Sequence, residues 1–320
     1  MDGDPPLTPT QQEVLDLLGA TPGQRPAFDL ELAAELEDLL ATGLLPLARS
    51  IPDDDTLFVS KHQLGQVHAC EARYLAEEAE EFEWSVPLAR GTVAHKAIEL
   101  SVHWRGPLHP LTLVDEALGR LENDSSGIGH WLQGTAEAER AELRGEANDR
   151  VAAFLECWPP LKRSWRPVTE SRVRSELCGG KIVLSGKVDL SLGQPHGLVA
   201  GKVLVDLKTG GGSPVHRDDL RFYALLETLR VGTPPRLLAT FYLDRGRFET
   251  EQVTEGVLEA SVHRVVAGVA RIIELHHDRR EPVRRPGPSC RWCPVSADCE
   301  PGTRYLSADD DLDLGEDWEG

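Results

Sequence analysis

Two segments that pattern as strands carry acidic and basic side chains among their apolar ones. In the segment Lys202 to Lys208, a strand period of two puts Asp206 and Lys208 on one face and the apolar residues on the other. In the segment Ile182 to Leu190 the apolar residues share a face, so Asp189 points to the opposite one. Mg²⁺ binds one or two carboxylates together with waters and phosphate oxygens, and a nearby lysine suits metal-assisted phosphodiester hydrolysis. For Asp206 and Lys208 by themselves, a surface ion pair is the alternative.

A third candidate lies in the segment Gly91-Thr92-Val93-Ala94-His95-Lys96-Ala97-Ile98-Glu99. His95 and Glu99 stand four residues apart, which places both on one face of a helix. A single histidine in such a helix is more often structural. Its chemistry therefore depends on whether the fold brings it to the two aspartates.

No export signal is expected from the N-terminal sequence, so the six cysteines indicate a reducing compartment, where metal ligation is the first hypothesis to test. Cys290, Cys293 and Cys299 form a Cys-x2-Cys-x5-Cys group, and Cys70 lies far upstream. Four thiolates suit zinc or an iron–sulfur cluster, and the spacing alone favours zinc. The remaining two cysteines have no partner at ligand spacing and are expected to be buried apolar residues.

Several arginines surround the cysteine group, and Trp292 lies inside it. Two interpretations remain open. The segment is either a solvated turn or a contact for a phosphate backbone, with the indole stacking on a base. The arginines concerned are Arg279, Arg280, Arg284, Arg285 and Arg291.

The elements that must position these residues divide into a helical first half and a mixed second half. Ser60 can cap one long helix, and Gly43 is expected to end an earlier one. The expected helices cover residues 11–18, 28–40, 60–81, 89–104, 135–158, 218–229 and 254–277. The expected strands, the first three as an antiparallel meander, cover residues 168–177, 181–192, 202–208, 237–243 and 247–253.

The net charge of -19 is concentrated at the two ends of the chain. Residues 1–55 hold 12 acids and two arginines, and residues 308–320 hold seven acids and no base, which leaves about -2 for the 252 residues between. A central body so close to neutral can still present a basic groove to nucleic acid. No apolar run has the length of a membrane helix, so a cytoplasmic protein without a membrane partner is expected.

Taken together, the three polar segments resemble the PD-(D/E)XK nuclease superfamily, in the branch of the RecB and AddB nuclease domains. That family has a Gly-x-x-x-His-x-x-x-Glu helix, an Asp in a Gly-x-x-Asp strand and an Asp/Glu-x-Lys-Thr-Gly strand end. These motifs match Gly91 to Glu99, Gly186 to Asp189 and Asp206 to Gly210, in the same order. The resemblance covers roughly residues 58 to 305.

The resemblance implies an α/β fold with a restriction-endonuclease-like core, in which helices flank a central mixed sheet. It also implies that His95, Asp189 and Asp206 are catalytic and bind Mg²⁺ or Mn²⁺, and that Lys208 is the catalytic lysine. The backbone carbonyl of Leu207 is a further candidate ligand. The site would thus draw its residues from one helix and two strands.

The same resemblance gives supporting roles to further residues. Glu99 and Glu170 are expected to lie behind the metal ligands. The family often has a Gln-x-x-x-Tyr helix that helps to hold the substrate, and Tyr223 matches its tyrosine. Asp219 replaces the glutamine, and because an anion there weakens a phosphate contact, Arg221 is expected to compensate.

The resemblance also changes the interpretation of the cysteines. One branch of these nucleases, which includes AddB and the CRISPR-adaptation nucleases, carries a [4Fe–4S] cluster held by one cysteine before the nuclease core and a Cys-x2-Cys-x5-Cys group after it. Cys70, Cys290, Cys293 and Cys299 reproduce that plan. A cluster is therefore preferred to Zn²⁺, as a staple across the 219 residues between Cys70 and Cys290 and not as a redox catalyst.

The resulting hypothesis is a RecB-like, metal-dependent exonuclease that cuts DNA, at single strands or ends, in repair, recombination or defence. A helicase is an expected partner, since the chain has no P-loop. The alternatives are a CRISPR-adaptation nuclease that trims spacers and a non-catalytic DNA-binding subunit of a helicase–nuclease assembly. The expected division is an acidic helical extension (1–55), a nuclease domain with the iron–sulfur site (56–305) and an acidic disordered tail (306–320).

Overall fold

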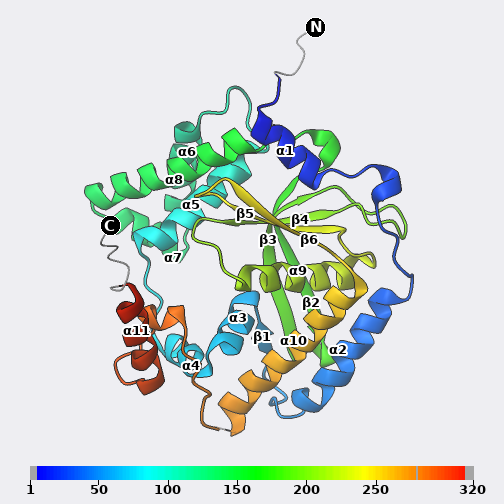
Figure 1. Cartoon of the computed structure of the whole chain (residues 1–320), viewed down its shortest axis with the longest axis vertical. Helices are drawn as coiled ribbons and strands as arrows, with labels where there is room; N and C mark the ends of the chain where they lie inside the picture. Colours follow the sequence, from blue (N-terminus) through cyan, green and yellow to red (C-terminus); the bar gives the residue numbers. More distant parts are fainter. Residues whose placement is uncertain (1–5, 279, 314–320) are drawn as a thin grey trace, which may run out of the picture. The chain divides into compact units, whose positions relative to one another are not determined.

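The computed structural model describes residues 6–278 and 280–313, with the backbone alone for residues 278 and 309–313. Helices and strands alternate along the second half of the chain (Figure 1). The helices are α1 (Pro9–Leu18), α2 (Leu32–Ala48), α3 (Lys61–Ala69), α4 (Glu71–Ala79), α5 (Val86–Ser101), α6 (Pro110–Glu122), α7 (Gly127–Gly134), α8 (Glu137–Cys157), α9 (Val215–Val231), α10 (Glu255–Ile273) and α11 (Glu300–Asp313). The strands are β1 (Leu57–Val59), β2 (Val168–Leu177), β3 (Ile182–Leu192), β4 (Val203–Lys208), β5 (Leu237–Tyr242) and β6 (Arg247–Gln252).

The strands form a mixed sheet in the order β1-β3-β4-β5-β6, with β2 also paired to β3. β3 and β4 are antiparallel, β4 and β5 are parallel, and β5 and β6 are antiparallel. The parallel pair needs a crossover, which α9 provides, since parallel strands cannot be joined by a tight turn. The expected α/β fold with a central mixed sheet between helices is therefore confirmed.

The chain divides into two compact units, each built from several segments. The first unit contains residues 1–37, 83–175 and 186–261, and the second contains residues 38–82, 176–185 and 262–320. The longest strand, β3, belongs to the second unit as far as Ser185 and to the first from Gly186 onward.

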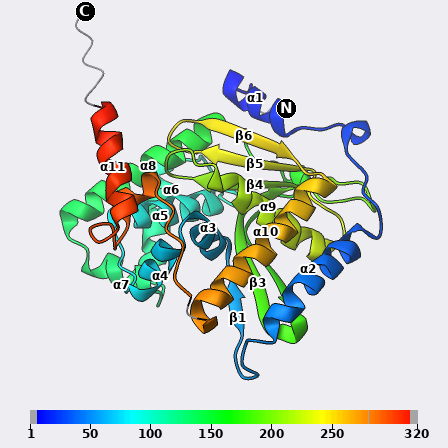
Figure 2. The same cartoon turned by 60° about the horizontal axis from the view of Figure 1, so that its bottom comes forward.

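In the first unit, helices cover both faces of the sheet. Val205 and Leu207 of β4 share a buried cluster with apolar residues of α5, α6 and α8, which pack together in Figure 1. The other face of β4 and β5 is covered by α9, which lies beneath these strands in Figure 2. α9 ends at Gly232, whose φ of 84° is the left-handed conformation that closes many helices. The strand alternation predicted for β4 is confirmed, because its polar side chains face α9.

In the second unit, glycines allow helices to approach closely. A Cβ at Gly43 would lie 2.7 Å from Cγ2 of Val266, so α2 and α10 pack together where no side chain separates them. The prediction that Gly43 ends its helix was wrong, since α2 continues to Ala48. Gly43 provides room for a neighbour and does not terminate the helix.

Other differences from the predicted elements have local causes. The helix capped by Ser60 is interrupted at Cys70, whose extended backbone (φ −159°, ψ 113°) separates α3 from α4. Helices α6 and α7 and strand β1 were not predicted, and β1 is only three residues long. Residues 306–313 continue α11 where a disordered tail was expected, and residues 314–320 lie outside the described part of the chain.

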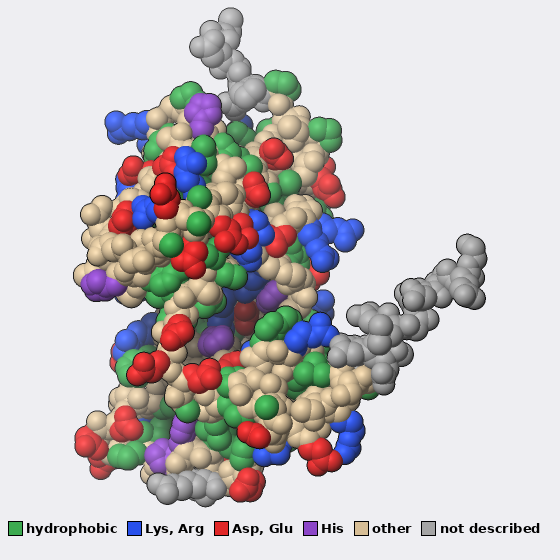
Figure 3. Space-filling view, turned by 90° about the vertical axis from the view of Figure 1, so that its left-hand side faces the viewer, with side chains coloured by type: hydrophobic (Ala, Val, Ile, Leu, Met, Phe, Trp, Pro, Cys, Tyr) green, Lys and Arg blue, Asp and Glu red, His purple; other side chains and the backbone are tan. Residues whose placement is uncertain are grey.

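Charged side chains of both signs are interspersed over the face of the molecule in Figure 3. On that face the described basic side chains do not merge into a broad single-sign band. Among the described residues, no helix combines the length and apolar character needed to cross a bilayer.

Candidate active site

Three predicted site residues meet in the first unit. His95 is on α5, Glu170 on β2 and Asp189 on β3. Nδ1 of His95 lies 3.4 Å from Oδ1 of Asp189 and 3.8 Å from Oε1 of Glu170. One ligand atom from each residue lies within 4.8 Å of the others, so the three side chains form a candidate metal site.

The backbone of Leu207 holds two of these side chains in place. Its N–H donates to Oδ2 of Asp189 at 2.7 Å, and its carbonyl oxygen lies 2.9 Å from Nε2 of His95. If Nε2 carries the proton, it donates to this carbonyl and leaves the Nδ1 lone pair facing the carboxylates. In this arrangement the Leu207 carbonyl orients the imidazole, and its expected role as a direct metal ligand stays a prediction.

Glu170 reaches the site from a strained backbone conformation. Its φ of 52° is left-handed, which is unusual for a non-glycine residue and costs on the order of 1–3 kcal/mol. The carboxylate also pairs with Lys187, a residue that the sequence analysis missed although it lies two positions before Asp189. Glu170, expected only as a supporting residue, therefore stands beside Asp189 at the centre of the group.

The predicted lysine lies between two aspartates. Nζ of Lys208 is 2.8 Å from Oδ2 of Asp206 and 3.2 Å from Oδ2 of Asp219. Asp206 is 1% exposed, and Asp219 extends from α9. From its position in the sequence, Asp219 was expected only as a poor substitute for a substrate-holding glutamine. In the structure it contacts the lysine, and this contact was not predicted.

The side chains of His95, Glu170, Lys187 and Lys208 line one open pocket of about 450 Å³. Gly91 lets α5 approach the end of β4, since a Cβ there would lie 3.2 Å from Oγ1 of Thr209. A second contact, unpredicted from sequence, comes from Arg90, which donates to the Thr209 carbonyl at 2.9 Å and pairs with Glu146 at 2.8 Å. The pocket is further lined by Leu88, Gly91, Thr92, Lys96, Glu99, Leu121, Leu207 and Thr209.

The charges in this group set the protonation of His95. Burial lowers the pKa of its imidazole, but the negative charges of Asp189 and Glu170 outweigh burial and raise that pKa. These carboxylates thus favour the protonated form of the ring. A cation that uses the imidazole competes with that proton.

The other predicted residues of this site lie around it. Glu99 lines the pocket and is held by Lys96 at 2.9 Å. Tyr223 is buried against Gly186, where a Cβ would lie 2.4 Å from the tyrosine ring, so the glycine of the Gly-x-x-Asp motif makes room for that ring. Arg221 pairs with Glu251 on β6 at 2.8 Å. Neither Tyr223 nor Arg221 lines the pocket, and their roles toward substrate stay predictions.

The four predicted cluster ligands meet in the second unit. Cys70, Cys290, Cys293 and Cys299 line one small pocket together with Gly302. A Cβ at Gly302 would lie 3.3 Å from Sγ of Cys299, which explains a glycine inside α11. Two backbone amides donate to sulfur: that of Gly287 to Cys290 at 3.4 Å and that of Arg285 to Cys70 at 3.5 Å.

A buried ion pair fixes the segment that leads to this cysteine pocket. Glu71, 3% exposed, accepts from both terminal nitrogens of Arg280, at 2.6 and 3.0 Å, and from the Val283 amide at 2.8 Å. The Arg280 guanidinium holds the pKa of Glu71 below its usual value. Because Arg280 is paired with Glu71, it is unsuitable as a contact for a phosphate backbone. Arg279 lies outside the described residues.

The other two cysteines, Cys157 and Cys178, lie apart from both groups. Burial raises the pKa of both thiols, so they are held in the neutral form. Both are only partly buried, and the expectation of fully buried side chains was therefore too strong.

The family model of the PD-(D/E)XK nuclease superfamily matches residues 59–300. This match covers most of the chain, and the chain therefore belongs to the PD-(D/E)XK nuclease superfamily. The matched range agrees closely with the range of the sequence resemblance. No curated protein matches the chain.

Similar solved structures include a proposed exonuclease of Eubacterium rectale, with 15% sequence identity and a TM-score of 0.45. That match covers 75% of this chain and 87% of the other. The protein SSO0001 has 13% identity and a TM-score of 0.36, with coverage of 83% and 96%. At these levels of similarity, neither structure indicates what this chain does.

Proposed function

We propose that this chain is a metal-dependent nuclease that hydrolyses phosphodiester bonds in DNA. The observation that carries the proposal is the group of His95, Glu170 and Asp189, whose ligand atoms lie within 4.8 Å of one another. Two of its members, His95 and Glu170, line the same pocket as Lys208. Membership of a nuclease superfamily supports the same class of reaction. The expected substrate, DNA, follows from the family resemblance.

The donor set fits a divalent cation. It offers one imidazole nitrogen and two carboxylate groups, a mixture that Mn²⁺ accepts readily. Mg²⁺ also fits, because it uses few carboxylates and keeps several waters. The pocket of about 450 Å³ leaves space for water and a phosphate group beside the ligands. When bound, the cation supplies Lewis-acid polarisation of the phosphate and neutralises its charge.

The protein's own groups complete the reaction centre. The Lys208 ammonium, which has three N–H donors, donates a hydrogen bond to Asp219 and forms an ion pair with Asp206. Its remaining donor capacity serves the attacking water or a phosphate oxygen, and the two carboxylates restrain the position of the ammonium. The Leu207 carbonyl keeps the imidazole of His95 in the orientation that presents Nδ1.

The test uses end-labelled single- and double-stranded DNA with Mg²⁺, with Mn²⁺ and with EDTA. Cleavage is expected with either cation and not with EDTA. Asp189→Asn should lose Mn²⁺ binding and cleavage, whereas Lys208→Met should lose cleavage but retain Mn²⁺ binding, which calorimetry measures separately. Lys162→Met, at an exposed lysine outside the pocket, is the matched control. Wild-type turnover in Lys208→Met would contradict the assignment.

Within this class, we propose a RecB-like exonuclease that acts on single strands or ends, in repair, recombination or defence and alongside a helicase. The motif order and the complete set of catalytic groups support it. A nuclease that trims spacers in CRISPR adaptation has the same motifs and is the alternative. A circular single strand, which has no end, separates end-dependent cleavage from internal cleavage. A non-catalytic subunit is disfavoured, because the chain keeps its lysine and all its acidic ligands.

We further propose that Cys70, Cys290, Cys293 and Cys299 hold a [4Fe–4S] cluster. The four thiols line one small pocket, and two backbone amides donate to their sulfurs. Hydrogen bonds to the sulfurs are among the features that tune iron–sulfur clusters, so this arrangement is compatible with the proposed cluster.

Absorbance and metal analysis of the anaerobically purified protein test this assignment. A brown protein with a broad shoulder near ~400 nm and about four irons per chain is expected from thiolate-to-iron charge transfer. Colourless protein with one zinc per chain would overturn it. Cys157→Ser is the control and should keep the absorbance.

A further inference from the structure

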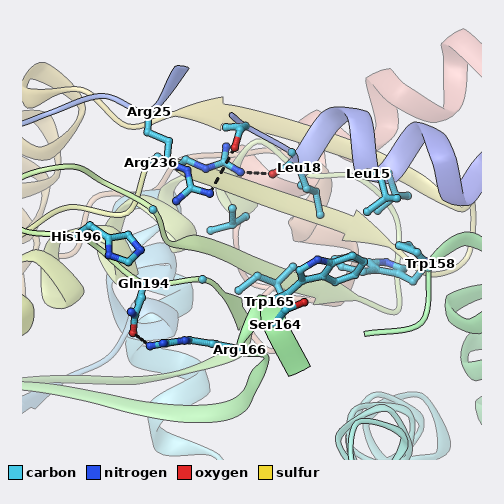
Figure 4. A pocket seen from close by; sticks show the side chains of 18 residues that line it. Leu15, Leu18, Arg25, Trp158, Ser164, Trp165, Arg166, Gln194, His196 and Arg236 are labelled. Carbon is cyan, nitrogen blue, oxygen red and sulfur yellow. Dashed lines mark hydrogen bonds between the residues drawn. The ribbon is translucent and has the colours of Figure 1, made fainter. Parts of the chain in front are cut away.

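A second large pocket lies in the first unit and shares no residue with the candidate active site. Its volume is about 430 Å³, within the range of small-molecule sites. Three chain segments and Arg236 form its walls (Figure 4). The segments are residues 14–25, residues 158–166 and residues 192–203. The first of them precedes the family match, which begins at residue 59, so this wall is an addition to the superfamily core.

The lining of this pocket is basic in an acidic protein. It includes Arg25, Arg166, Arg236 and His196 but no aspartate or glutamate, although the chain has 53 acidic residues. Figure 4 shows the guanidinium groups of Arg25 and Arg236 close together on one side of the pocket. Burial, and then the positive charge of Arg25, lower the pKa of Arg236. The guanidinium groups of Arg25 and Arg236 therefore repel each other in a partly desolvated environment.

Neither of these two guanidinium groups is compensated by a carboxylate among the described residues. Arg236 donates to the Leu18 carbonyl, and Arg25 donates to the Ala20 carbonyl at 3.4 Å. Their Nε atoms are buried and have no hydrogen-bond partner in the described part of the chain. Gly201 lies against Arg25, since a Cβ there would be 3.3 Å from its Nη1. Buried donors and uncompensated charge both favour an anion at this position.

Aromatic rings form the opposite side of the pocket. Trp158 and Trp165 lie across from the arginine pair in Figure 4, and Trp165 is the more exposed of the two. The Trp158 ring is held by stacking on Phe154, with ring centroids 5.2 Å apart, and its indole N–H is a further buried donor without a partner in the described residues. A flat ring can pack against Trp165 at this side.

We propose that this pocket binds a nucleoside monophosphate, with the phosphate on Arg25 and Arg236 and the base against Trp165. Paired guanidinium groups match the oxygens of a phosphate, and a bound dianion relieves their mutual repulsion. An aromatic surface across a pocket of this size suits a nucleobase, which inorganic phosphate lacks. The site goes beyond the proposed nuclease function and does not rest on it.

Calorimetry on the full chain tests the proposal, with EDTA present to keep divalent cations from the candidate active site. The probes are adenosine 5′-monophosphate, adenosine and inorganic phosphate. The monophosphate should bind at least tenfold more tightly than either of the others, since only it engages both sides of the pocket. Equal binding of adenosine and the monophosphate, or no binding of the monophosphate, would overturn the site.

Variants locate the binding. Arg236→Gln and Arg25→Gln should each weaken binding of the monophosphate at least tenfold, and circular dichroism checks that each variant is folded. Arg25 comes from a loop, so its variant covers the case in which Arg236→Gln fails to fold. Arg245→Gln, an exposed arginine outside the pocket, is the charge-matched control. Lys208→Met should bind normally, and loss of binding in that variant would place the nucleotide at the catalytic pocket and refute the proposal.

Discussion

Asp219 is expected to act through Lys208, the residue that its carboxylate contacts. It stands where related nucleases often have glutamine, and its oxygen lies 3.2 Å from Nζ of Lys208. A carboxylate at this distance orients the ammonium. We therefore expect Asp219 to position the lysine and not to contact substrate.

Asp219→Asn is expected to lower kcat by roughly 10- to 100-fold, the usual effect of losing a group that orients a catalytic one. KM for DNA should change little, since the proposed role is toward Lys208 and not toward substrate. Steady-state cleavage kinetics give both values. Asp218→Asn, at the preceding position of the same helix, is the control and should stay close to wild type. A change confined to KM would indicate a direct substrate contact instead.

Two substitutions at Glu170 can distinguish the strain of its left-handed backbone from the metal-binding role of its carboxylate. Glycine adopts this conformation without strain, so Glu170→Gly should unfold at higher denaturant concentration than Glu170→Gln, with a difference of about 1 kcal/mol. Both variants lose one carboxylate from the metal group, and both should bind Mn²⁺ more weakly. Chemical denaturation and calorimetry measure the two effects. If the glutamine variant were the more stable, strain at this position would be excluded.

Packing between elements depends on a few close approaches. α2 and α10 meet at Gly43, where the nearest atom to an added Cβ, at 2.7 Å, belongs to the side chain of Val266. A branched side chain close to the backbone has little freedom to move aside. The contact therefore requires glycine at one helix and tolerates valine at the other.

Gly43→Ala is expected to destabilise the protein by about 1–3 kcal/mol through overpacking, even though alanine favours helix. Val266→Ala on the same background should recover part of this loss by removing the clashing methyl groups. A double-mutant cycle from denaturant unfolding measures the coupling. Gly119→Ala is the control, because no atom lies within 4 Å of a Cβ there, and it should be neutral or stabilising. Additive effects of the two substitutions at Gly43 and Val266 would show that the contact is not limiting.

At the scale of the whole molecule, the two proposed metal centres belong to different units. The His95 group lies in residues assigned to the first unit, and the four cysteines lie in the second. A change at one centre is therefore expected to loosen its own unit first, as local unfolding occurs in cooperative parts of a structure.

Cys290→Ser should increase hydrogen exchange in α3, α4 and the segment 288–306. Exchange in α5, α6 and α8 should stay near the wild-type rate, since these helices share a buried cluster with Val205 and Leu207 of the first unit. Exchange followed by mass spectrometry resolves the two sets of segments. Uniform acceleration through both units would instead indicate a single cooperative structure.

Much of the nuclease core could be predicted from local sequence patterns. The alternation of polar and apolar residues predicted that Asp206 and Lys208 share one face of a strand. The spacing of four residues predicted that His95 and Glu99 share one face of a helix. Glu170 was harder to place, because its direction depends on a left-handed φ that its residue type does not suggest. The Asp219 contact depends on how α9 crosses back over the sheet. Such contacts arise from tertiary structure, so no local sequence pattern predicts them.

The pocket of Arg25 and Arg236 also could not be predicted from sequence patterns. Its residues come from positions up to 222 apart, between Val14 and Arg236, and none forms a recognised motif. The acidic composition of the first 55 residues pointed away from an anion site. Only the fold reveals that Arg25 of this segment lies beside Arg236, in a pocket that none of the segment's described acids lines.

The break between α3 and α4 at Cys70 affects when the second unit can fold during synthesis on the ribosome. This residue emerges 229 positions before Cys299, the last member of its pocket. At about 5–20 residues per second, the first thiol waits roughly 10 to 45 seconds for its final partner. The helices on either side of Cys70 are nine residues each, too short to persist alone. The second unit can therefore close only near the end of synthesis, and a nascent chain that stalls before residue 290 leaves Cys70 without the other three thiols of its pocket.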